Sequence, residues 1–173
     1  MEIEILLKES VEEDYHYLKE WFEDTENNVW FTSELRGLKE YRKMFFLMAL
    51  KKKSNKYYTI FSKENMHCHP IGFIALINID YGDRFGQVWY VLGDKNYRRK
   101  GLTSKALSLL LIKCKEELKL HSVYTWVVED NIGSIKVLVN NGFSRIGIQK
   151  EAYYFNNIFK NRILYDKVLS AER

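Results

Sequence analysis

A basic turn that contains glycine could bind an anion where a strand runs into a helix. The segment Arg98 to Gly101 follows the apolar run Gln87 to Leu92 and directly precedes the helical pattern Leu102 to Leu118. A helix start offers unpaired N–H groups and the positive end of the helix dipole, and a glycine lets the backbone approach a phosphate closely. The same residues would suit a solvated turn, because runs of charge often face water. The segment therefore indicates either a phosphate site or a solvated basic turn.

A second helix start carries polar side chains at positions that suit a ligand. Asn131 is a natural N-cap and Ser134 falls at the third helical position, immediately after the strand-like run Ser122 to Val128. This run should lie beside the strand that enters the basic turn, so both polar groups are expected close to that turn. Helix capping alone would also explain Asn131.

The elements around these two segments alternate between strand and helix patterns. Strand patterns cover Ile3 to Leu7, Tyr57 to Phe61, Ile71 to Ile79, Gln87 to Leu92, Ser122 to Val128, and the chain from Phe143 onward. Helical patterns cover Ser10 to Phe22, Glu40 to Lys53, Leu102 to Leu118, and Asn131 to Asn141. Ser10 and Glu13 predict a capping box at the first helix, and Glu23 to Gly37 is predicted to be a loop.

The order of these elements predicts an α/β protein with a mixed sheet. Three consecutive strands imply antiparallel hairpins, whereas the strands that flank Leu102 to Leu118 should be parallel because a crossover helix joins them. We therefore expect a mostly antiparallel (α+β type) sheet that contains one parallel pair and carries helices on both faces.

The composition fits one compact domain that spans residues 1–173. The chain has 173 residues, 46% hydrophobic and 29% charged, with a single proline, which excludes collagen-like and Pro-rich disordered classes. The longest apolar run, Met44 to Leu50, is too short to cross a membrane, and we expect no leader peptide and a cytoplasmic location. The net charge of +4 is too mild to favour nucleic acid, and Cys68 and Cys114 are expected to be reduced thiols.

Taken together, the two polar segments resemble the GNAT superfamily of acyl-CoA-dependent N-acetyltransferases. The resemblance covers roughly Ile71 to Leu169. The family's pyrophosphate signature, Arg/Gln-x-x-Gly-x-Gly/Ala, is similar to Arg98-x-x-Gly101-x-Thr103, although Thr103 departs from the usual small residue. The later Asn-x-x-Ser and Asn-Gly-Phe patterns match Asn131, Ser134 and the run Asn141 to Phe143. The segment Glu151 to Arg162 resembles the branch of ribosomal-protein and related N-terminal acetyltransferases.

The resemblance implies acetyl-CoA as cosubstrate, without a metal. Pantetheine would lie between the splayed strands Gln87 to Leu92 and Ser122 to Val128, and a backbone N–H near Val91 or Leu92 would polarise the thioester carbonyl. Leu138 stands where many members have a tyrosine that protonates the leaving thiolate, so Ser134 becomes the candidate acid. The implied cofactor-binding residues are Val91, Leu92, Arg98, Arg99, Lys100, Gly101, Leu102, Thr103, Asn131 and Ser134.

The resemblance leaves the general base open, because Gln87 stands near the place of the glutamate that the family often uses. The remaining candidates are Glu34, Glu129, Asp130, Glu151, His67 and His69, or a base that acts through ordered water. Weak base machinery favours an amine that is already partly neutral. An α-amine with a pKa of about 7.7 to 8.0 meets this condition better than a lysine side chain at about 10.4.

These residues favour a small primary amine of low pKa as acceptor, such as an amino sugar, including a nucleotide-linked one. A protein N-terminus, as in ribosomal-protein-type acetyltransferases, and a non-catalytic acyl-CoA-binding module are the alternatives. Trp30, Phe31, Tyr41, Phe45 and Phe46 could line an acceptor pocket or pack in the core. The run His67 to His69 lacks the further ligands that a zinc site needs, and Pro70 predicts a turn there. The sequence leaves the oligomeric state open, with a homodimer among the options.

Overall fold

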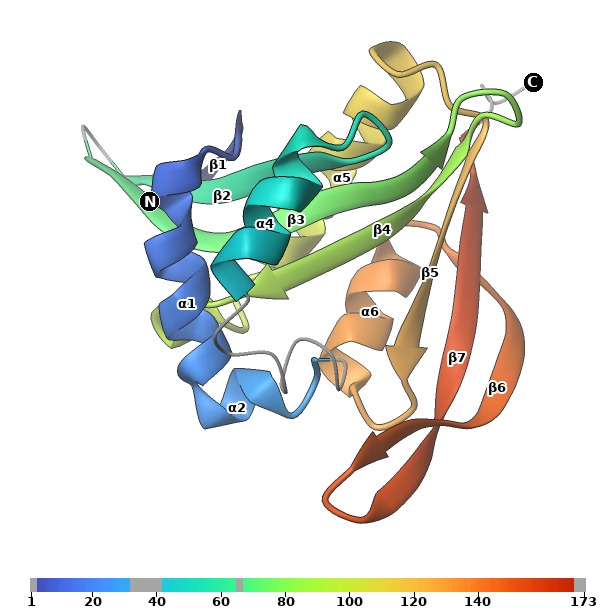
Figure 1. Ribbon diagram of the computed structural model, residues 1–173. Helices are drawn as coiled ribbons and strands as arrows, with labels where there is room; N and C mark the ends of the chain where they lie inside the picture. Colours follow the sequence, from blue (N-terminus) through green and yellow to red (C-terminus); the bar gives the residue numbers. More distant parts are fainter. Residues whose placement is uncertain (1–2, 32–41, 65–66, 170–173) are drawn as a thin grey trace.

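The computed structural model describes residues 3–31, 42–64 and 67–169. Its strands form one seven-stranded sheet in the order β1-β2-β3-β4-β5-β7-β6 (Figure 1). The strands are β1 (Glu4–Glu9), β2 (Lys56–Glu64), β3 (His67–Asp80), β4 (Phe85–Leu92), β5 (Ser122–Val128), β6 (Ser144–Phe155) and β7 (Ile158–Val168). The first four strands pair antiparallel in chain order, β4 and β5 pair parallel, and β7 joins β5 to β6 antiparallel. The predicted mixed sheet is therefore confirmed.

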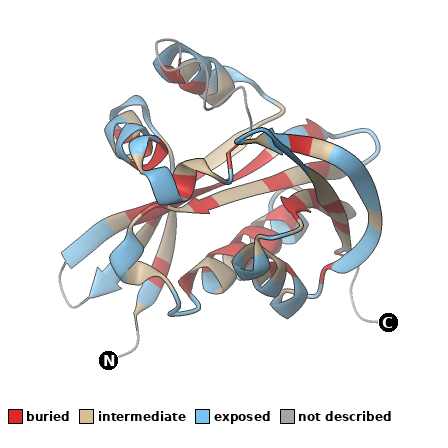
Figure 2. Ribbon diagram, turned by 90° about the horizontal axis from the view of Figure 1, so that it is seen from below, coloured by how far each residue is buried: buried red, intermediate tan, exposed pale blue. Residues whose placement is uncertain are grey.

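Helices cover both faces of this sheet. The helices are η1 (Glu12–Asp14), α1 (Tyr15–Glu23), α2 (Thr25–Asn28), α4 (Arg42–Lys51), η3 (Lys95–Tyr97), α5 (Leu102–Glu116) and α6 (Ile132–Asn140), where η denotes a 3-10 turn. One core cluster joins the sheet to α5 and α6, and a second joins it to α1 and α4. Figure 2 shows the buried residues gathered in the sheet and on the helix sides that face it.

Burial on both faces explains the sequence of the central strand. The run Ile71 to Leu76 on β3 is buried at every position, as expected for a strand that helices cover on both sides. Successive side chains point to opposite faces, so Ile74 packs in the cluster with α5 and Phe73 packs in the cluster with α1. The sheet is therefore the layer against which α5 and α6 pack.

The helix α5 follows from a helical spacing of apolar residues. Leu102, Ala106, Leu110 and Cys114 recur every four residues and are all buried. The chain passes directly from the parallel strand β4 through η3 into this helix and then into β5, which is the crossover that the sequence predicts.

The predicted capping box of Ser10 and Glu13 is wrong. The Ser10 hydroxyl lies 3.0 Å from Thr59 Oγ1 on β2, so it does not cap the helix. Asp14 instead accepts a hydrogen bond of 3.1 Å from the backbone N–H of Val11. The contact with β2 thus takes the serine away from the helix, and α1 begins only after the turn η1.

Two further local predictions need correction. The predicted loop Glu23 to Gly37 contains the short helix α2, whose first N–H groups are capped by the Asp24 carboxylate. The run His67 to His69 is not a turn, because it pairs with the end of β2 and forms the start of β3. Pairing with a neighbouring strand has outweighed the local turn preference of Pro70.

Candidate active site

The two parallel strands of the sheet separate halfway along their length. Their pairing runs from the start of β4 only as far as Gln87 and Tyr124, and the described strands then diverge. The Thr125 hydroxyl donates a buried hydrogen bond of 2.8 Å to the carbonyl oxygen of Val88, the first residue of β4 beyond the paired stretch. A cavity of about 960 Å³ lies along this opening and is lined by both strands, by the start of α5 and by α6.

Backbone N–H groups of β4 face the opening between the strands. The N–H of Gly93 donates to β3 at 2.9 Å, whereas the carbonyl of Val88 faces β5. Because successive residues of a strand direct their backbone groups to alternate sides, the N–H groups of Tyr90 and Leu92 face the opening. Of the two positions expected to polarise a carbonyl, Leu92 rather than Val91 has this direction.

The start of α5 has the geometry of an anion site. Gly101 is its N-cap, with φ of +72°, and no side chain caps the first turn of the helix. A Cβ added at Gly101 would have no heavy atom within 4 Å, so the backbone is open there. Arg99 also has a positive φ, of +61°. Left-handed positions close together in a turn direct N–H groups into one concave surface that suits phosphate oxygens.

All but one of the predicted cofactor-binding residues line this cavity. The cavity includes Val91, Leu92, Arg98, Arg99, Gly101, Leu102, Thr103, Asn131 and Ser134. Lys100 lies outside it and lines a neighbouring cavity of about 380 Å³, with its ammonium 5.1 Å from the ring centre of Tyr97.

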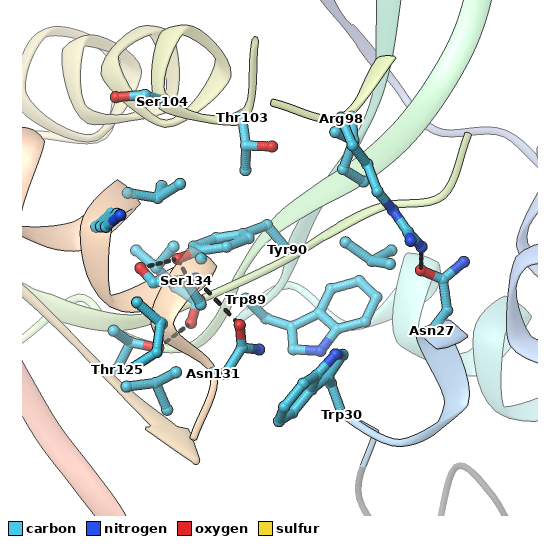
Figure 3. Close-up of a pocket in the computed structure, with 18 of the residues that line it drawn as sticks. Asn27, Trp30, Trp89, Tyr90, Arg98, Thr103, Ser104, Thr125, Asn131 and Ser134 are labelled. Atoms are coloured by element: carbon cyan, nitrogen blue, oxygen red, sulfur yellow. Dashed lines mark hydrogen bonds between the residues drawn. The ribbon is translucent and has the colours of Figure 1, made fainter. Parts of the chain in front are cut away.

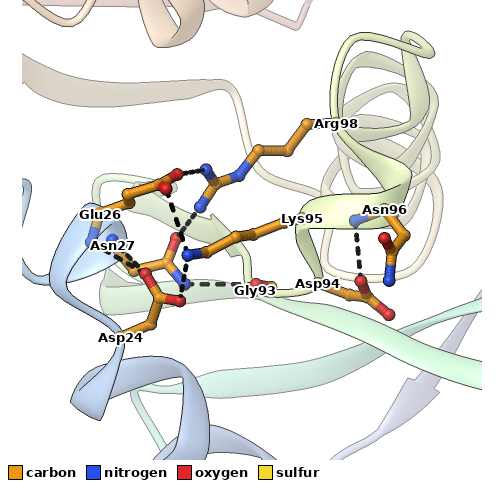
Figure 4. A network of polar contacts seen from close by, with 8 residues as sticks. All are labelled: Asp24, Glu26, Asn27, Gly93, Asp94, Lys95, Asn96 and Arg98. Carbon is orange, nitrogen blue, oxygen red and sulfur yellow. Dashed lines mark hydrogen bonds and ion pairs between the residues drawn. The ribbon is translucent and has the colours of Figure 1, made fainter.

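Arg98 contacts α2. Its guanidinium donates to the Glu26 carboxylate at 2.6 Å and to Asn27 Oδ1 at 2.7 Å (Figure 4). Asn27 is buried and donates through Nδ2 to the carbonyl oxygen of Gly93 at 3.2 Å. The signature arginine therefore ties α2 to the turn that leads into α5.

Lys95 extends this network of charges. Its ammonium lies 2.7 Å from the Asp24 carboxylate and 3.2 Å from that of Glu26 (Figure 4). The hydrogen bond from Lys95 lowers the pKa of the Asp24 carboxyl, and the hydrogen bond from Arg98 lowers the pKa of the Glu26 carboxyl. Both carboxylates are thus held ionised beside the turn.

Ser134 contacts a residue that the sequence analysis missed. Its Oγ lies 2.7 Å from Tyr90 Oη, and both side chains line the cavity (Figure 3). Asn131 caps α6 by accepting the Ser134 N–H at 3.1 Å, as predicted. Leu138 is completely buried in the core, so it has no access to the cavity. Strand alternation could have indicated Tyr90 from the sequence, because it places this side chain on the same face as Val88 and Leu92, toward α6.

Aromatic side chains line the opposite part of the cavity. Trp30 and Trp89 contribute indole rings, which Figure 3 shows between Asn27 and Asn131. Phe31 also lines the cavity, and its carbonyl oxygen accepts a hydrogen bond of 2.9 Å from the buried Tyr153 hydroxyl.

The other aromatic candidates divide between core and surface. Phe46 is buried against Phe73, whereas Phe45 is exposed, and neither lines the cavity. Tyr41 lies outside the described residues. The aromatic surface of the cavity therefore comes from the segment after α2 and from β4, with Tyr97 of η3 and Trp126 of β5 in addition.

The carboxylates that were candidates for the base have structural partners. Glu129 accepts hydrogen bonds from the N–H and the side-chain amide of Asn161, at 2.8 and 2.9 Å, which ties the end of β5 to β7. Asp130 forms an ion pair with Lys160. Glu151 is exposed on β6 with a positive φ of +53°.

None of the other base candidates in the described part of the chain lines the cavity. His67 and His69 lie on the first residues of β3, outside its lining. Glu34 lies outside the described residues. Among the described lining residues, the one carboxylate is that of Glu26, which is engaged by Arg98 and Lys95. Gln87 does line the cavity.

The described part of the chain contains neither a candidate metal cluster nor a candidate membrane-spanning helix. Within 3–31, 42–64 and 67–169, no three histidine, cysteine or acidic side chains come together in a way that could hold a metal ion. In the same ranges no helix is both long and apolar enough to span a bilayer.

Comparisons with known proteins agree on one family. The model of the acetyltransferase (GNAT) domain matches residues 4–144. A probable N-acetyltransferase, YjcK of Bacillus subtilis (strain 168), is 32% identical over 92 residues, which are 53% of this chain and 50% of that protein. The chain therefore spans about half the length of the curated relative that it matches.

Solved structures of low sequence identity share the fold. The spermidine N-acetyltransferase from Vibrio cholerae in complex with CoA and spermine is 15% identical, with a TM-score of 0.85 and coverage of 95% of both chains. A chimera of this enzyme, SpeG, with hSSAT is 14% identical, with a TM-score of 0.83 and the same coverage.

Proposed function

Because the chain belongs to the GNAT acetyltransferase family, we propose that it transfers the acetyl group of acetyl-CoA to a small primary amine of low pKa, such as an amino sugar. The observation that carries the proposal is the opening between β4 and β5, which leads from the uncapped start of α5 to the Ser134 hydroxyl. A linear cosubstrate with a pyrophosphate at one end and a thioester at the other suits such a path.

The polar groups along the cavity match the parts of acetyl-CoA. The N–H groups from Arg99 to Thr103 would hold the pyrophosphate, because this turn has left-handed residues and an uncapped helix follows it. Pantetheine would lie between the strands beyond Gln87 and Tyr124, where β4 is no longer paired with β5. The N–H of Leu92 would then polarise the thioester carbonyl, and Ser134 would face the sulfur.

The reaction needs a neutral amine and a stabilised leaving group. The amine nitrogen attacks the carbonyl carbon, the C–N bond forms, and the C–S bond breaks with its electron pair on sulfur. The nitrogen then loses one proton and the thiolate gains one, so the products are the amide and the free thiol of CoA. Ser134 would donate the proton to the thiolate, because its hydroxyl lines the cavity and has Tyr90 as a hydrogen-bond partner.

The described cavity favours an acceptor that is easily deprotonated. The engaged Glu26 is its one described carboxylate, and its pKa is lowered, so it is a weak proton acceptor. An amine of low pKa needs no strong base, because a substantial fraction is already neutral near pH 7.5.

The acceptor end of the cavity suits a ring rather than a polycation. Trp30 and Trp89 offer flat apolar faces, on which the C–H surface of a sugar ring or another small ring can pack. The charged side chains that line the described cavity are basic apart from Glu26, namely Arg98, Arg99 and Lys136. Glu26, the one carboxylate among the described lining residues, is engaged by Arg98 and Lys95, so it offers little attraction to an acceptor with several positive charges.

A thiol-release assay over a panel of amines tests the proposal. The panel contains amino sugars, nucleotide-linked amino sugars, peptides with free N-termini, peptides with an internal lysine, and spermidine, the substrate in the name of the similar solved enzymes. We expect amino sugars to give the highest kcat/KM. Preference for peptide N-termini would favour a protein N-terminal acetyltransferase. Tight CoA binding, with no release of the CoA thiol in the presence of any amine, would identify a non-catalytic acyl-CoA-binding module and overturn the proposal.

A further inference from the structure

The contact between Tyr90 and Ser134 joins the two elements on either side of the predicted thioester site. Tyr90 belongs to β4 and Ser134 to the first turn of α6, and their oxygens lie 2.7 Å apart although 44 residues separate them in the chain. We propose that Tyr90 is a positioning residue that donates its hydroxyl hydrogen to Ser134 Oγ and thereby directs the Ser134 hydroxyl hydrogen toward the sulfur of CoA. This inference rests on the proposed function, because it needs CoA in the cavity.

The backbone fixes Tyr90 in place for this contact. β4 is hydrogen-bonded to β3 along this stretch, with Tyr90 opposite Ile74, a completely buried core residue. Strand alternation points the Tyr90 side chain to the face that carries α6. On the other side, the Asn131 cap holds the Ser134 N–H at 3.1 Å and so fixes the first turn of α6. Sheet pairing and the helix cap therefore hold the two elements that carry Tyr90 and Ser134.

The direction of the hydrogen bond follows from the partners of each oxygen. Tyr90 Oη has a single hydrogen and two oxygens within reach, Ser134 Oγ at 2.7 Å and the Ser134 carbonyl oxygen at 3.3 Å. The carbonyl belongs to the first turn of α6, where helical geometry gives it the N–H four residues later as a donor. Oγ is nearer and lacks such a donor, so it is the better acceptor for Tyr90.

Partial burial favours the neutral, hydrogen-donating form of Tyr90. Removal from water raises the pKa of Tyr90 well above its ordinary value, with the hydrogen bond to Ser134 opposing this effect only in part. The neutral form of Tyr90 is therefore favoured, so its hydroxyl keeps the hydrogen that it donates. Once Ser134 Oγ accepts this hydrogen, its own hydrogen must point elsewhere, and the cavity that both residues line is the open direction.

This arrangement gives the site an oriented donor although Leu138 stands where many family members have a tyrosine. Leu138 is fully buried and cannot reach a ligand. A serine hydroxyl rotates freely unless a partner fixes it, and a hydrogen bond to its oxygen also makes its own hydrogen a stronger donor. Tyr90 thus acts on the leaving thiolate through Ser134 and does not need to touch the sulfur itself.

The thiol pKa of bound CoA tests the proposal without knowledge of the acceptor. A donor aimed at sulfur stabilises the thiolate, so each loss of donation should raise this pKa, which ultraviolet absorbance of the thiolate reports. We expect Ser134→Ala to raise it by about one unit and Tyr90→Phe by roughly half a unit. The charged groups that face the same cavity, Arg98, Arg99, Lys136 and Glu26, are unchanged in both variants.

The double variant separates positioning from a general structural effect. Tyr90→Phe should add nothing in the Ser134→Ala background, because its effect passes through the serine hydroxyl. Tyr58→Phe is the matched control. Tyr58 is a buried tyrosine on β2 outside the cavity, and its variant should leave the thiol pKa unchanged.

Three results would overturn the proposal in distinguishable ways. A wild-type thiol pKa in Tyr90→Phe, with the Ser134→Ala shift intact, would refute the role of Tyr90 alone. Additive shifts in the double variant would show that Tyr90 acts independently of Ser134. A wild-type protein that fails to bind CoA in calorimetry would refute the proposed function and this inference together.

Discussion

Thr125 Oγ1 donates a hydrogen bond of 2.8 Å to the carbonyl oxygen of Val88 at the point where β4 and β5 separate. A parallel partner strand would normally supply a backbone N–H to that carbonyl. The threonine side chain replaces the missing strand contact, so a buried carbonyl keeps a partner while the strands open. A single hydroxyl therefore satisfies the backbone at the closed end of the candidate active site.

Replacement of this hydroxyl should destabilise the protein. Thr125→Val keeps the side-chain shape but leaves the Val88 carbonyl without its donor, which should cost about 1–3 kcal/mol of unfolding free energy. Urea denaturation followed by circular dichroism measures the loss. Thr125→Ser keeps the hydroxyl and serves as the control, with a smaller effect. Equal stability of Thr125→Val and the wild type would show that water satisfies the carbonyl.

Gly101→Pro should abolish CoA binding. Proline fixes φ near −65°, whereas Gly101 has φ of +72° at the start of α5, so the turn that presents the phosphate-binding N–H groups cannot form. Calorimetry with CoA measures the affinity. Gly147→Ala is the control, because its new Cβ would meet only Leu164 Cδ1 at an ordinary 3.7 Å. Unchanged CoA affinity of a folded Gly101→Pro variant would show that the pyrophosphate binds elsewhere.

Ser134→Ala should lower kcat with little effect on CoA affinity. The hydroxyl faces the cavity, whereas the helix cap uses only the Ser134 backbone N–H, so the variant removes the donor and leaves the start of α6 intact. We expect a roughly 10- to 1,000-fold loss of kcat where chemistry limits the rate. Steady-state kinetics and CoA calorimetry provide the two measurements. An unchanged kcat would leave Ser134 as a residue of the helix start alone.

Local patterns predicted the elements that build this site. The apolar spacing of α5 and the glycine before it specify a helix start after a strand, and the alternation of strand and crossover helix specifies the parallel pair. Asn131 and Ser134 were found because a cap and the residue that it binds lie three positions apart in the chain. Such features depend on neighbours in sequence, which a sequence displays directly.

The missed features depend on partners that are distant in sequence. Tyr90 meets Ser134 across 44 residues, and Arg98 meets Asn27 across 71 residues. The incorrect prediction of a helix cap at Ser10 has the same cause, because the Ser10 hydroxyl contacts Thr59, which lies 49 residues away. A side chain that suits a local motif can be engaged by a strand or helix whose place is set only by tertiary packing. The role of each polar residue therefore required the fold.

Trp30→Ala should weaken binding of the acceptor and leave the affinity for CoA unchanged. Loss of an aromatic face that packs on the acceptor ring is worth about 0.5–1.5 kcal/mol, or a roughly 2- to 12-fold rise in the acceptor KM. Steady-state kinetics with the best amine of the panel provide the KM, and calorimetry checks CoA. Phe45→Ala is the control, because Phe45 is exposed and lies outside the cavity lining. An unchanged acceptor KM would exclude packing on Trp30.

The pH dependence of kcat/KM should follow the acceptor and not the protein. The described ionisable groups with shifted pKa values at the cavity do not titrate in the working range: Glu26 is ionised because Arg98 lowers its pKa, and Tyr90 is neutral because burial raises its pKa. If the neutral amine is the reactive form, kcat/KM should rise roughly tenfold per pH unit and level off at the acceptor's own pKa.

Two acceptors of different pKa make this test decisive. The plateau should move with the amine when kcat/KM is measured from about pH 6 to 9, because Glu26, the one carboxylate among the described lining residues, is engaged by Arg98 and Lys95. A plateau at the same pH for both amines would instead report a base on the protein. Glu34→Gln, Glu129→Gln and Glu151→Gln would then test three of the candidates that the sequence offers. Glu129→Gln should also lower stability, because its carboxylate ties β5 to β7 through Asn161, so only a change in the pH profile counts as evidence for a base.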